Sequence, residues 1–308
     1  EIGVRLVGSE MCIRDRIIQA LSQSGTFVAD DIGMRFQDNR QEQSFNAYIC
    51  QQIARLKRLG KIRTSETYTA AFRSFNGFMN DKEVLFNQIS ADLIAEYEAY
   101  LKGRGNSPNT ISFYMRVLKA VYNRAVEDGL TGQRHPFKSV YTGMEKTLKR
   151  AISLNDLKRI KGLDLSLKPN LDFARDMFLF CFYTRGMSFI DMAYLRKKDL
   201  QNGILSYRRR KTGQQLFIKW ERCMQEIVDK YPINETEYLL PIITKRNKDY
   251  RKQYTNELHR VNHLLKKIGK QLDLSIPLTM YVGRHSWASI AKSRNVPISV
   301  ISEGMGHD

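Results

Sequence analysis

Residues 42–128 repeat apolar side chains at helical spacing almost without interruption, and this pattern limits the fold more than any other feature of the sequence. Each stripe recurs every three or four positions, so it covers one face of a helix. The first two stripes consist of Phe45, Ile49, Ile53 and Leu56, and of Tyr68, Phe72, Phe75 and Met79. Four such segments with short connections predict a small helical bundle over residues 42–130.

The third and fourth segments carry residue types that begin helices. Ser90 stands directly before the third segment as an N-cap, and Gly103 and Gly105 mark its end. Ser107 caps the fourth segment, with Pro108 at the first helical position, where the missing N–H has no consequence. These signals predict helices that start directly after Ser90 and Ser107.

A basic segment without a sustained period separates this bundle from a second domain. Residues 131–150 combine glycine, proline, lysine and arginine and are predicted as a linker. The capping sequence "SLND", which begins at Ser153, then opens a new helix. We therefore place the second domain at residues 151–308.

The second domain is expected to be mostly helical with one β-hairpin. "LDFARDMFLFCFYT" predicts a buried helix, and residues 204–220 alternate around a Thr212-Gly213 turn, as hairpin strands do. "EYLLPII" (237–243) and the later segments are also expected to be helical. The predicted fold class is mainly α with a small β-hairpin or sheet, in which the second domain is α+β.

Basic residues outnumber acidic ones by 50 to 32, which gives a formal net charge of +18. Most of the excess lies in residues 151–308 and in the linker before them. Such a chain is drawn to polyanions, with nucleic acid first and an anionic membrane second. A basic surface that binds nothing is the alternative. No basic amphipathic helix favours the membrane, and no apolar run approaches the ~20 residues that span a bilayer.

Metal and cofactor chemistry is not indicated. His259 and His263 lie four apart on one helix face, but no third ligand accompanies them. There is no glycine-rich phosphate loop. The four cysteines lack metal-ligand spacing and are expected to be reduced thiols of a cytoplasmic protein; they are Cys12, Cys50, Cys181 and Cys223.

Several basic residues are candidates for binding a phosphate. Arg185 ends an apolar helix ahead of Gly186, where it could either bind the last carbonyls of that helix or direct its planar guanidinium at a phosphate. Lys211 stands at the hairpin tip, and a lysine that enters a groove can give a proton to a leaving oxygen. The arginines before it (Arg208, Arg209 and Arg210) are DNA-binding candidates, although a basic run is often only a solvated strand face.

The segment "YVGRHSWASIAKSRNVPISVISEGMGHD" adds Arg284, His285 and His307. A salt bridge or a buried hydrogen bond could explain any one of them. Their occurrence together, behind Arg185 and Lys211, is much harder to explain as packing. His285 is therefore counted among the DNA-binding candidates.

The order of Arg185, Lys211, Arg284 and the Gly-His pair resembles the tyrosine recombinases, or phage integrases. The phrases "RGMSFIDMAYLRKKDL" and "GRHSWAS" are similar to those of Bacteroides-type mobile-element integrases. The resemblance covers residues 42–308. It implies that residues 42–130 form a SAM-like core-binding domain and residues 151–308 the catalytic domain.

The resemblance also implies roles for individual residues. Arg185 and Arg284 match the two arginines that clamp the scissile phosphate, Lys211 matches the lysine that protonates the departing 5′-oxygen, and His307 matches a residue that hydrogen-bonds the phosphate. The reaction that the resemblance implies is site-specific cleavage and rejoining of DNA strands through a 3′-phosphotyrosyl intermediate. It requires no cofactor, since the phosphotyrosyl link conserves the bond energy.

The implied partner is double-stranded DNA, and no membrane partner is expected. The resemblance also implies a homotetramer in the synaptic complex, with a monomer or weak oligomer away from DNA.

The sequence departs from the family pattern at one catalytic position. Tyr281 stands where a histidine is usual, three residues before the second arginine. A phenol is a poor base at neutral pH but can donate a hydrogen bond to a phosphate oxygen. We expect Tyr281 to be such a donor, with His285 or His307 left as the proton acceptor.

The two ends of the chain carry further expectations. The nucleophilic tyrosine is expected shortly past the Gly-His pair, and because the sequence stops at Asp308, this chain is expected to bind DNA without cleaving it. Residues 1–16 resemble a translated sequencing adapter, and residues 17–41 resemble the remnant of a preceding domain. The alternatives are an inactive, integrase-derived DNA-binding regulator and a type IB topoisomerase.

Overall fold

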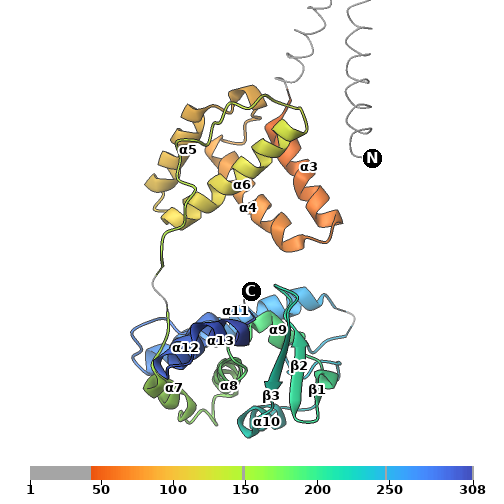
Figure 1. Ribbon diagram of the computed structural model, residues 1–308, viewed down its shortest axis with the longest axis vertical. Coiled ribbons are helices and arrows are strands. Elements are labelled where there is room, and N and C mark those ends of the chain that lie inside the picture. Colours follow the sequence, from red (N-terminus) through yellow and green to blue (C-terminus); the bar gives the residue numbers. More distant parts are fainter. Residues whose placement is uncertain (1–42, 148–149, 247, 307–308) are drawn as a thin grey trace, which may run out of the picture. The chain divides into compact units, whose positions relative to one another are not determined.

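The computed structural model describes residues 43–147, 150–246 and 248–306 (Figure 1). The chain divides into two compact units, Glu1–Thr147 and Leu148–Asp308. The expectations for residues 1–16 and 17–41 fall outside the described residues.

The described part of the first unit is a helical bundle around an aromatic core. Its helices are α3 (Phe45–Arg58), α4 (Ile62–Phe78), α5 (Ala91–Gly103) and α6 (Pro108–Glu127), with a 3-10 turn, η1 (Phe86–Gln88), between α4 and α5. Helix α6 packs against the other three helices. The buried ring of Phe75 meets Phe45 at 5.8 Å and Tyr97 at 5.2 Å, both edge to face. The predicted order of helices is confirmed.

The predicted helix starts are also confirmed. The Ser90 hydroxyl oxygen accepts a hydrogen bond from the Leu93 N–H at 3.1 Å, and the Ser107 oxygen accepts one from the Thr110 N–H at 3.3 Å. Each hydroxyl satisfies a backbone donor that has no partner within its own helix. The sequence signal and the structural cap therefore have the same physical origin.

Residues 129–147 form neither helix nor strand, but part of this segment packs on the first unit. Phe137 and Val140 are buried in the core of the bundle. The Asn109 amide donates to the Glu145 carbonyl at 3.1 Å and accepts from the Glu145 N–H at 2.8 Å. These contacts hold much of the basic segment on the bundle.

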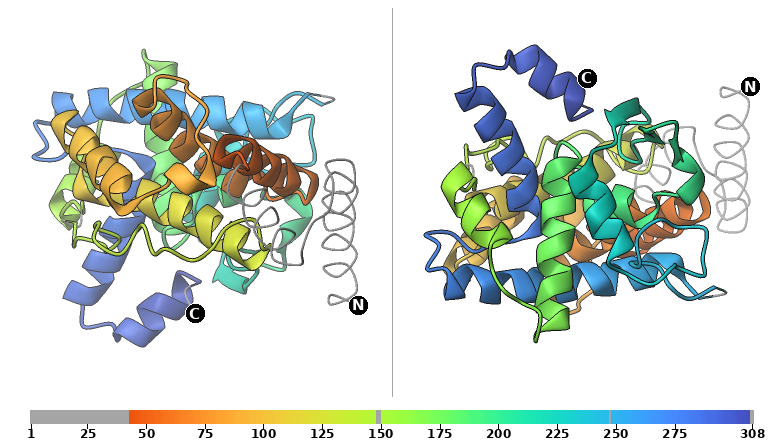
Figure 2. Two further views of the ribbon diagram at one scale, coloured as in Figure 1. Left: turned by 90° about the horizontal axis from the view of Figure 1, so that it is seen from above. Right: turned by 90° about the horizontal axis from the view of Figure 1, so that it is seen from below.

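The second unit is built around one central helix, α8 (Pro169–Tyr183), which packs against α7 (Leu154–Lys161), α10 (Arg222–Asp229), α11 (Tyr250–Gln271) and α12 (Met280–Ser293). The right-hand view of Figure 2 shows α8 in bright green among these helices. The remaining helical elements are α9 (Phe189–Ala193), η2 (Lys197–Asp199) and α13 (Ile298–Gly304). Because apolar side chains cover α8 on several sides, the predicted buried helix is confirmed.

The described residues of the second unit contain a three-stranded antiparallel sheet in the order β1-β2-β3. Strands β2 (Ile204–Arg208) and β3 (Gln215–Lys219) form the predicted hairpin, and Leu205 pairs with Ile218. Both of these side chains are buried, whereas Phe217 on the opposite face is exposed. Strand β1 (Leu200–Gln201) was not predicted, because two residues are too few to show an alternating pattern.

The prediction of a helix at residues 237–243 is wrong. The segment is an irregular connection in which Tyr238 forms an isolated bridge with Arg196. The Asn234 amide donates to the carbonyls of Leu240 and Ile243, both at 3.0 Å. Pro241 has no N–H to give to a helix, so side chains satisfy these buried carbonyls instead.

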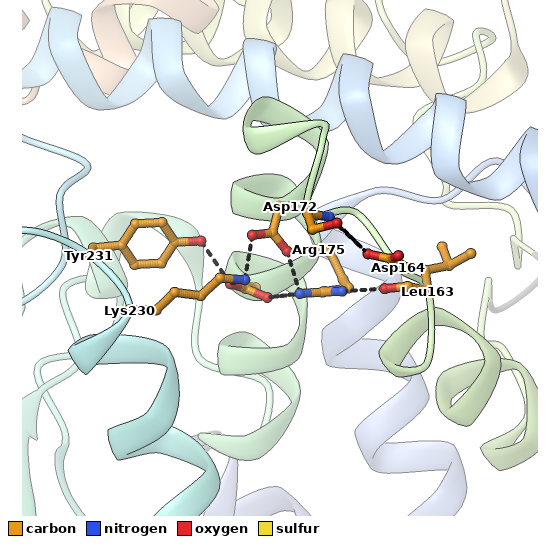
Figure 3. A network of polar contacts seen from close by, with 8 residues as sticks. Leu163, Asp164, Asp172, Arg175, Lys230 and Tyr231 are labelled. Carbon is orange, nitrogen blue, oxygen red and sulfur yellow. Dashed lines mark hydrogen bonds and ion pairs between the residues drawn. The ribbon is translucent and has the colours of Figure 1, made fainter.

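A network of charged groups fixes the N-terminal half of α8 to the residues that follow α10 (Figure 3). Arg175 pairs with Asp172 and with Asp176, the latter at 3.0 Å. Lys230 also binds both carboxylates, and the Tyr231 hydroxyl donates to Asp176 at 2.8 Å. Since Asp176 is 3% exposed, these partners satisfy a carboxylate that has little access to water.

Candidate active site

A cavity of about 720 Å³ opens in the second unit between the hairpin loop, the start of α9, and helices α11, α12 and α13. Its described wall contains the cationic residues Arg209, Lys211 and Arg284, together with Tyr281 and His285. No aspartate or glutamate belongs to this described wall. A concave surface with cations and without carboxylates is suited to binding an anion.

Arg185 lies in the turn that ends α8. It has a left-handed backbone conformation (φ 58°), as does Gly186 (φ 74°), and the Gly186 N–H bonds back to the Cys181 carbonyl at 2.8 Å. The described residues contain no hydrogen-bond partner for the Arg185 guanidinium, so the alternative that it binds the last carbonyls of its helix is not observed. Its Cδ lies 3.7 Å from the position of a Cβ built on Gly304, next to the end of α13.

Arg284 is 9% exposed and joins two turns. Its Nη1 donates to the Gly186 carbonyl at 2.5 Å, and its Nη2 donates to the Met305 carbonyl at 2.7 Å. Burial lowers the pKa of the guanidinium, and repulsion from Arg209 lowers it further. Such a group still remains protonated at neutral pH, so it brings a fixed cation to the cavity.

Arg208 and Arg210 lie on the exposed side of the hairpin loop. The Arg208 guanidinium donates to the Gly213 carbonyl at 2.9 Å. The Arg210 N–H donates to an oxygen of the buried Asp191 at 2.9 Å, and its guanidinium carbon lies 3.9 Å from the centre of the Tyr194 ring. Both side chains are accessible to a ligand at the surface.

Arg209 differs from its two neighbours, since it is only 5% exposed. Strand alternation places it on the same inner face as Leu205 and Tyr207. Its Nη1 donates to the Gly306 carbonyl. The alternation of side chains along a strand could have indicated this inward position. A run of three arginines is more typical of a solvated strand face, so the sequence alone groups Arg209 with its exposed neighbours.

Lys211, Tyr281 and His285 reach the same cavity from two elements. Lys211 is exposed on the hairpin loop. Tyr281 and His285 are one turn apart on α12, and their rings meet edge to face with centroids 4.3 Å apart. Tyr281 is 66% exposed, so its hydroxyl is available to a bound ligand.

Gly306 ends the described chain in a left-handed turn (φ 68°). A Cβ at this position would lie 2.9 Å from the Arg209 Cδ and 3.0 Å from the Leu216 Cδ1. The turn therefore requires glycine both for its backbone conformation and for its space. His307, the next residue, lies outside the described residues.

The described cysteines, and the described histidines outside the cavity, show no cluster. Cys50, Cys181 and Cys223 are free thiols, and burial raises the pKa of Cys181 to about 12. Within the described ranges, no group of three or more His, Cys, Asp or Glu side chains could hold a metal ion. None of the described helices is long and apolar enough to cross a bilayer.

Comparison with known proteins finds a match for the first unit and relatives that cover most of the chain. Residues 44–143 match the family model of the phage integrase SAM-like domain. The tyrosine recombinase XerA of Thermococcus kodakarensis is 24% identical over 224 residues, which cover 71% of this chain and 74% of the relative. The tyrosine recombinase XerD of Listeria innocua is 19% identical over 260 residues, which cover 79% of this chain and 84% of the relative.

Solved structures share the fold. A lambda integrase dimer bound to a COC′ core site matches with a TM-score of 0.69 at 15% identity, over 94% of this chain and 82% of that one. The Tn1549 transposon integrase in complex with transposon right end DNA matches with a TM-score of 0.61 at 16% identity, over 86% of this chain and 92% of that one.

The helical first unit and the second unit with its small sheet together have the phage-integrase fold, a SAM-like domain followed by an integrase catalytic domain. The chain is similar in sequence to tyrosine recombinases, and its first unit matches the phage integrase SAM-like domain.

Proposed function

We propose that this protein binds double-stranded DNA and that its cavity holds a DNA phosphodiester for site-specific strand cleavage and rejoining. The observation that carries the proposal is the described cavity wall, which combines Arg209, Lys211 and Arg284 with no carboxylate. A phosphodiester is an anion that guanidinium groups bind through paired oxygens. The relatives that match the chain are tyrosine recombinases, which supports the same reaction class.

In this proposal the cations act on charge that develops during the reaction. Arg185 and Arg284 bind the non-bridging oxygens, where negative charge increases in phosphoryl transfer. Lys211 protonates the leaving 5′-oxygen, and its exposed position on the hairpin loop allows it to approach bound DNA. His307 adds a hydrogen bond to the phosphate.

Tyr281 is proposed as a hydrogen-bond donor to the phosphate and not as the nucleophile. Its exposed ring on the cavity wall is consistent with this role. Removing one donor that stabilises a transition state lowers the rate by about 10². In a recombinase chain that carries the nucleophilic tyrosine, Tyr281→Phe should therefore slow cleavage of a nicked suicide substrate while covalent DNA complexes still form. Cleavage at the unchanged rate would contradict the role.

The first unit is also proposed to bind DNA. Residues 42–130 are proposed as the core-binding domain, residues 131–150 as a basic connection that also contacts the duplex, and residues 151–308 as the catalytic domain. We further propose a homotetramer in the synaptic complex and a monomer or weak oligomer away from DNA. One supporting observation is a matching structure of a lambda integrase tetramer bound to a Holliday junction.

The test is duplex binding by fluorescence anisotropy at increasing salt concentration. If six to ten phosphates are neutralised, the affinity should fall by ~10³ to 10⁵ between 50 and 200 mM salt. An affinity that stays constant over this range would reject the proposed binding mode. Salt-dependent binding that is unaffected by Arg185→Gln and Lys211→Gln would favour an inactive DNA-binding regulator, since such a protein does not need the cations proposed to act on the phosphate.

A further inference from the structure

We infer that Arg209 is a positioning residue, which holds the hairpin loop with Lys211 against the Gly306 turn. The positive charge of Arg209 is then balanced by an anion that binds in the cavity. The inference rests on the proposed function, because that anion is then the DNA phosphate. It assigns Arg209 a place inside the site and not on the exposed strand face.

The contacts of Arg209 connect two separate parts of the cavity wall. Its backbone closes the hairpin loop, since its N–H donates to the Gln214 carbonyl at 2.8 Å and its carbonyl accepts from the Gly213 N–H at 2.7 Å. Its side chain then leaves this loop and donates through Nη1 to the Gly306 carbonyl. The Thr212 hydroxyl donates to the same carbonyl at 3.4 Å. The loop and the turn are therefore joined mainly through one guanidinium.

Gly306 packs so closely against Arg209 that a movement of the arginine side chain should also move the turn. A Cβ on Gly306 would lie 2.9 Å from the Arg209 Cδ, so the turn rests directly on the arginine. Arg284 binds the preceding carbonyl, that of Met305, at 2.7 Å. Two guanidinium groups thus hold consecutive carbonyls of the chain that leads into His307. A change at Arg209 should shift both Lys211, two residues away in its loop, and the Gly306 turn.

In the described part of the chain, the Arg209 guanidinium donates to the Gly306 carbonyl and forms no ion pair with a carboxylate. The nearby Asp191 already accepts from the Ser188 hydroxyl at 2.6 Å and from the Arg210 N–H at 2.9 Å. The Nε of Arg209 is also buried without a partner. Burying an unpaired ion costs several kcal/mol, so a residue needed only for stability would be better replaced by an apolar one. An anion in the cavity offsets this cost.

The experiment measures the melting temperature of the second unit in chloride and in inorganic phosphate at equal ionic strength. A ligand that binds only the folded state raises stability by RT ln(1 + [L]/Kd). Arg209→Gln should lower the melting temperature in chloride and should also remove most of the phosphate-dependent rise. A tenfold loss of phosphate affinity corresponds to up to about 1.4 kcal/mol less stabilisation. Arg209→Lys keeps the charge and should restore part of the rise.

Arg175→Gln is the matched control, because Arg175 is another largely buried arginine of the second unit, which lies in the α8 network (Figure 3). Arg175 does not belong to the described cavity wall. It should lower the melting temperature in both buffers and keep the full phosphate-dependent rise. A full rise in Arg209→Gln would overturn the inference and leave the proposed function intact. If that variant does not fold, a full rise in Arg209→Lys together with a lower melting temperature in chloride overturns it, and a reduced rise supports it. A wild-type protein that gains no stability from phosphate and binds no duplex overturns the proposed function itself.

Discussion

The Arg284 guanidinium donates a 2.5 Å hydrogen bond to the Gly186 carbonyl, although 98 positions separate the two residues. The contact joins the turn after α8 to helix α12, and it places Arg284 beside the turn that contains Arg185. The same guanidinium reaches the Met305 carbonyl. One buried side chain thereby sets the relative positions of three parts of the proposed phosphate site.

Gly186→Ala should destabilise the second unit and weaken duplex binding. A Cβ at Gly186 would lie 2.9 Å from the Arg284 Cα, and a side chain in a left-handed conformation adds about 1–2 kcal/mol. We expect the free energy of unfolding to fall by more than about 2 kcal/mol in urea denaturation, because overpacking adds to the backbone effect. Gly203→Ala is the control, since Gly203 has a similar φ of 72° but no atom near its Cβ position. Equal losses in the two variants would show that the contact with Arg284 has no role.

Lys211→Gln should weaken binding to duplexes of any sequence and reduce the slope of log K against log salt by about 1, because one phosphate contact is lost. The control is Lys219→Gln, which removes the same charge from the far end of the hairpin, where Lys219 pairs with Ile204. Fluorescence anisotropy at several salt concentrations measures both slopes. A steeper loss in Lys219→Gln would place the DNA on the other end of the hairpin.

Arg175→Gln should lower the free energy of unfolding by up to about 3–5 kcal/mol, because it leaves buried carboxylates with fewer cations. The Arg175 side chain is 13% exposed and that of Asp176 is 4% exposed. By comparison, Arg222→Gln breaks an ion pair with Glu226 whose side chains are 92% and 59% exposed, so its effect should stay within about 0–1 kcal/mol. Urea denaturation followed by circular dichroism distinguishes the two. Similar small effects would mean that the α8 network contributes little to stability.

Cys181 should resist alkylation in the folded protein. Burial raises its pKa to about 12, so the reactive thiolate is nearly absent at neutral pH. Its sulfur also packs 3.3 Å from the position of a Cβ on Gly283. Iodoacetamide followed by peptide mass mapping should label the exposed Cys50 first and Cys181 only after unfolding in urea. Labelling of both at equal rates before unfolding would contradict the buried position.

Local patterns in the sequence determined most of the helices and the hairpin. Helical spacing, the caps at Ser90 and Ser107, and the alternation around Thr212-Gly213 each reflect hydrogen bonds or side-chain directions within a few residues, so they could be predicted without the fold. The family resemblance, which depended on the order of basic residues, led to the same class of protein that the comparisons support.

Only the tertiary structure determined which partners the polar groups of those elements bind. The backbone carbonyls near Pro241 are satisfied by Asn234 and not by a helix, and Phe137 enters the core of the first unit from a segment without periodicity. Arg209 looked like its two neighbours in sequence, yet it is buried against Gly306, 97 positions away. Such placements depend on packing and desolvation between distant segments, whose free energies no local pattern contains.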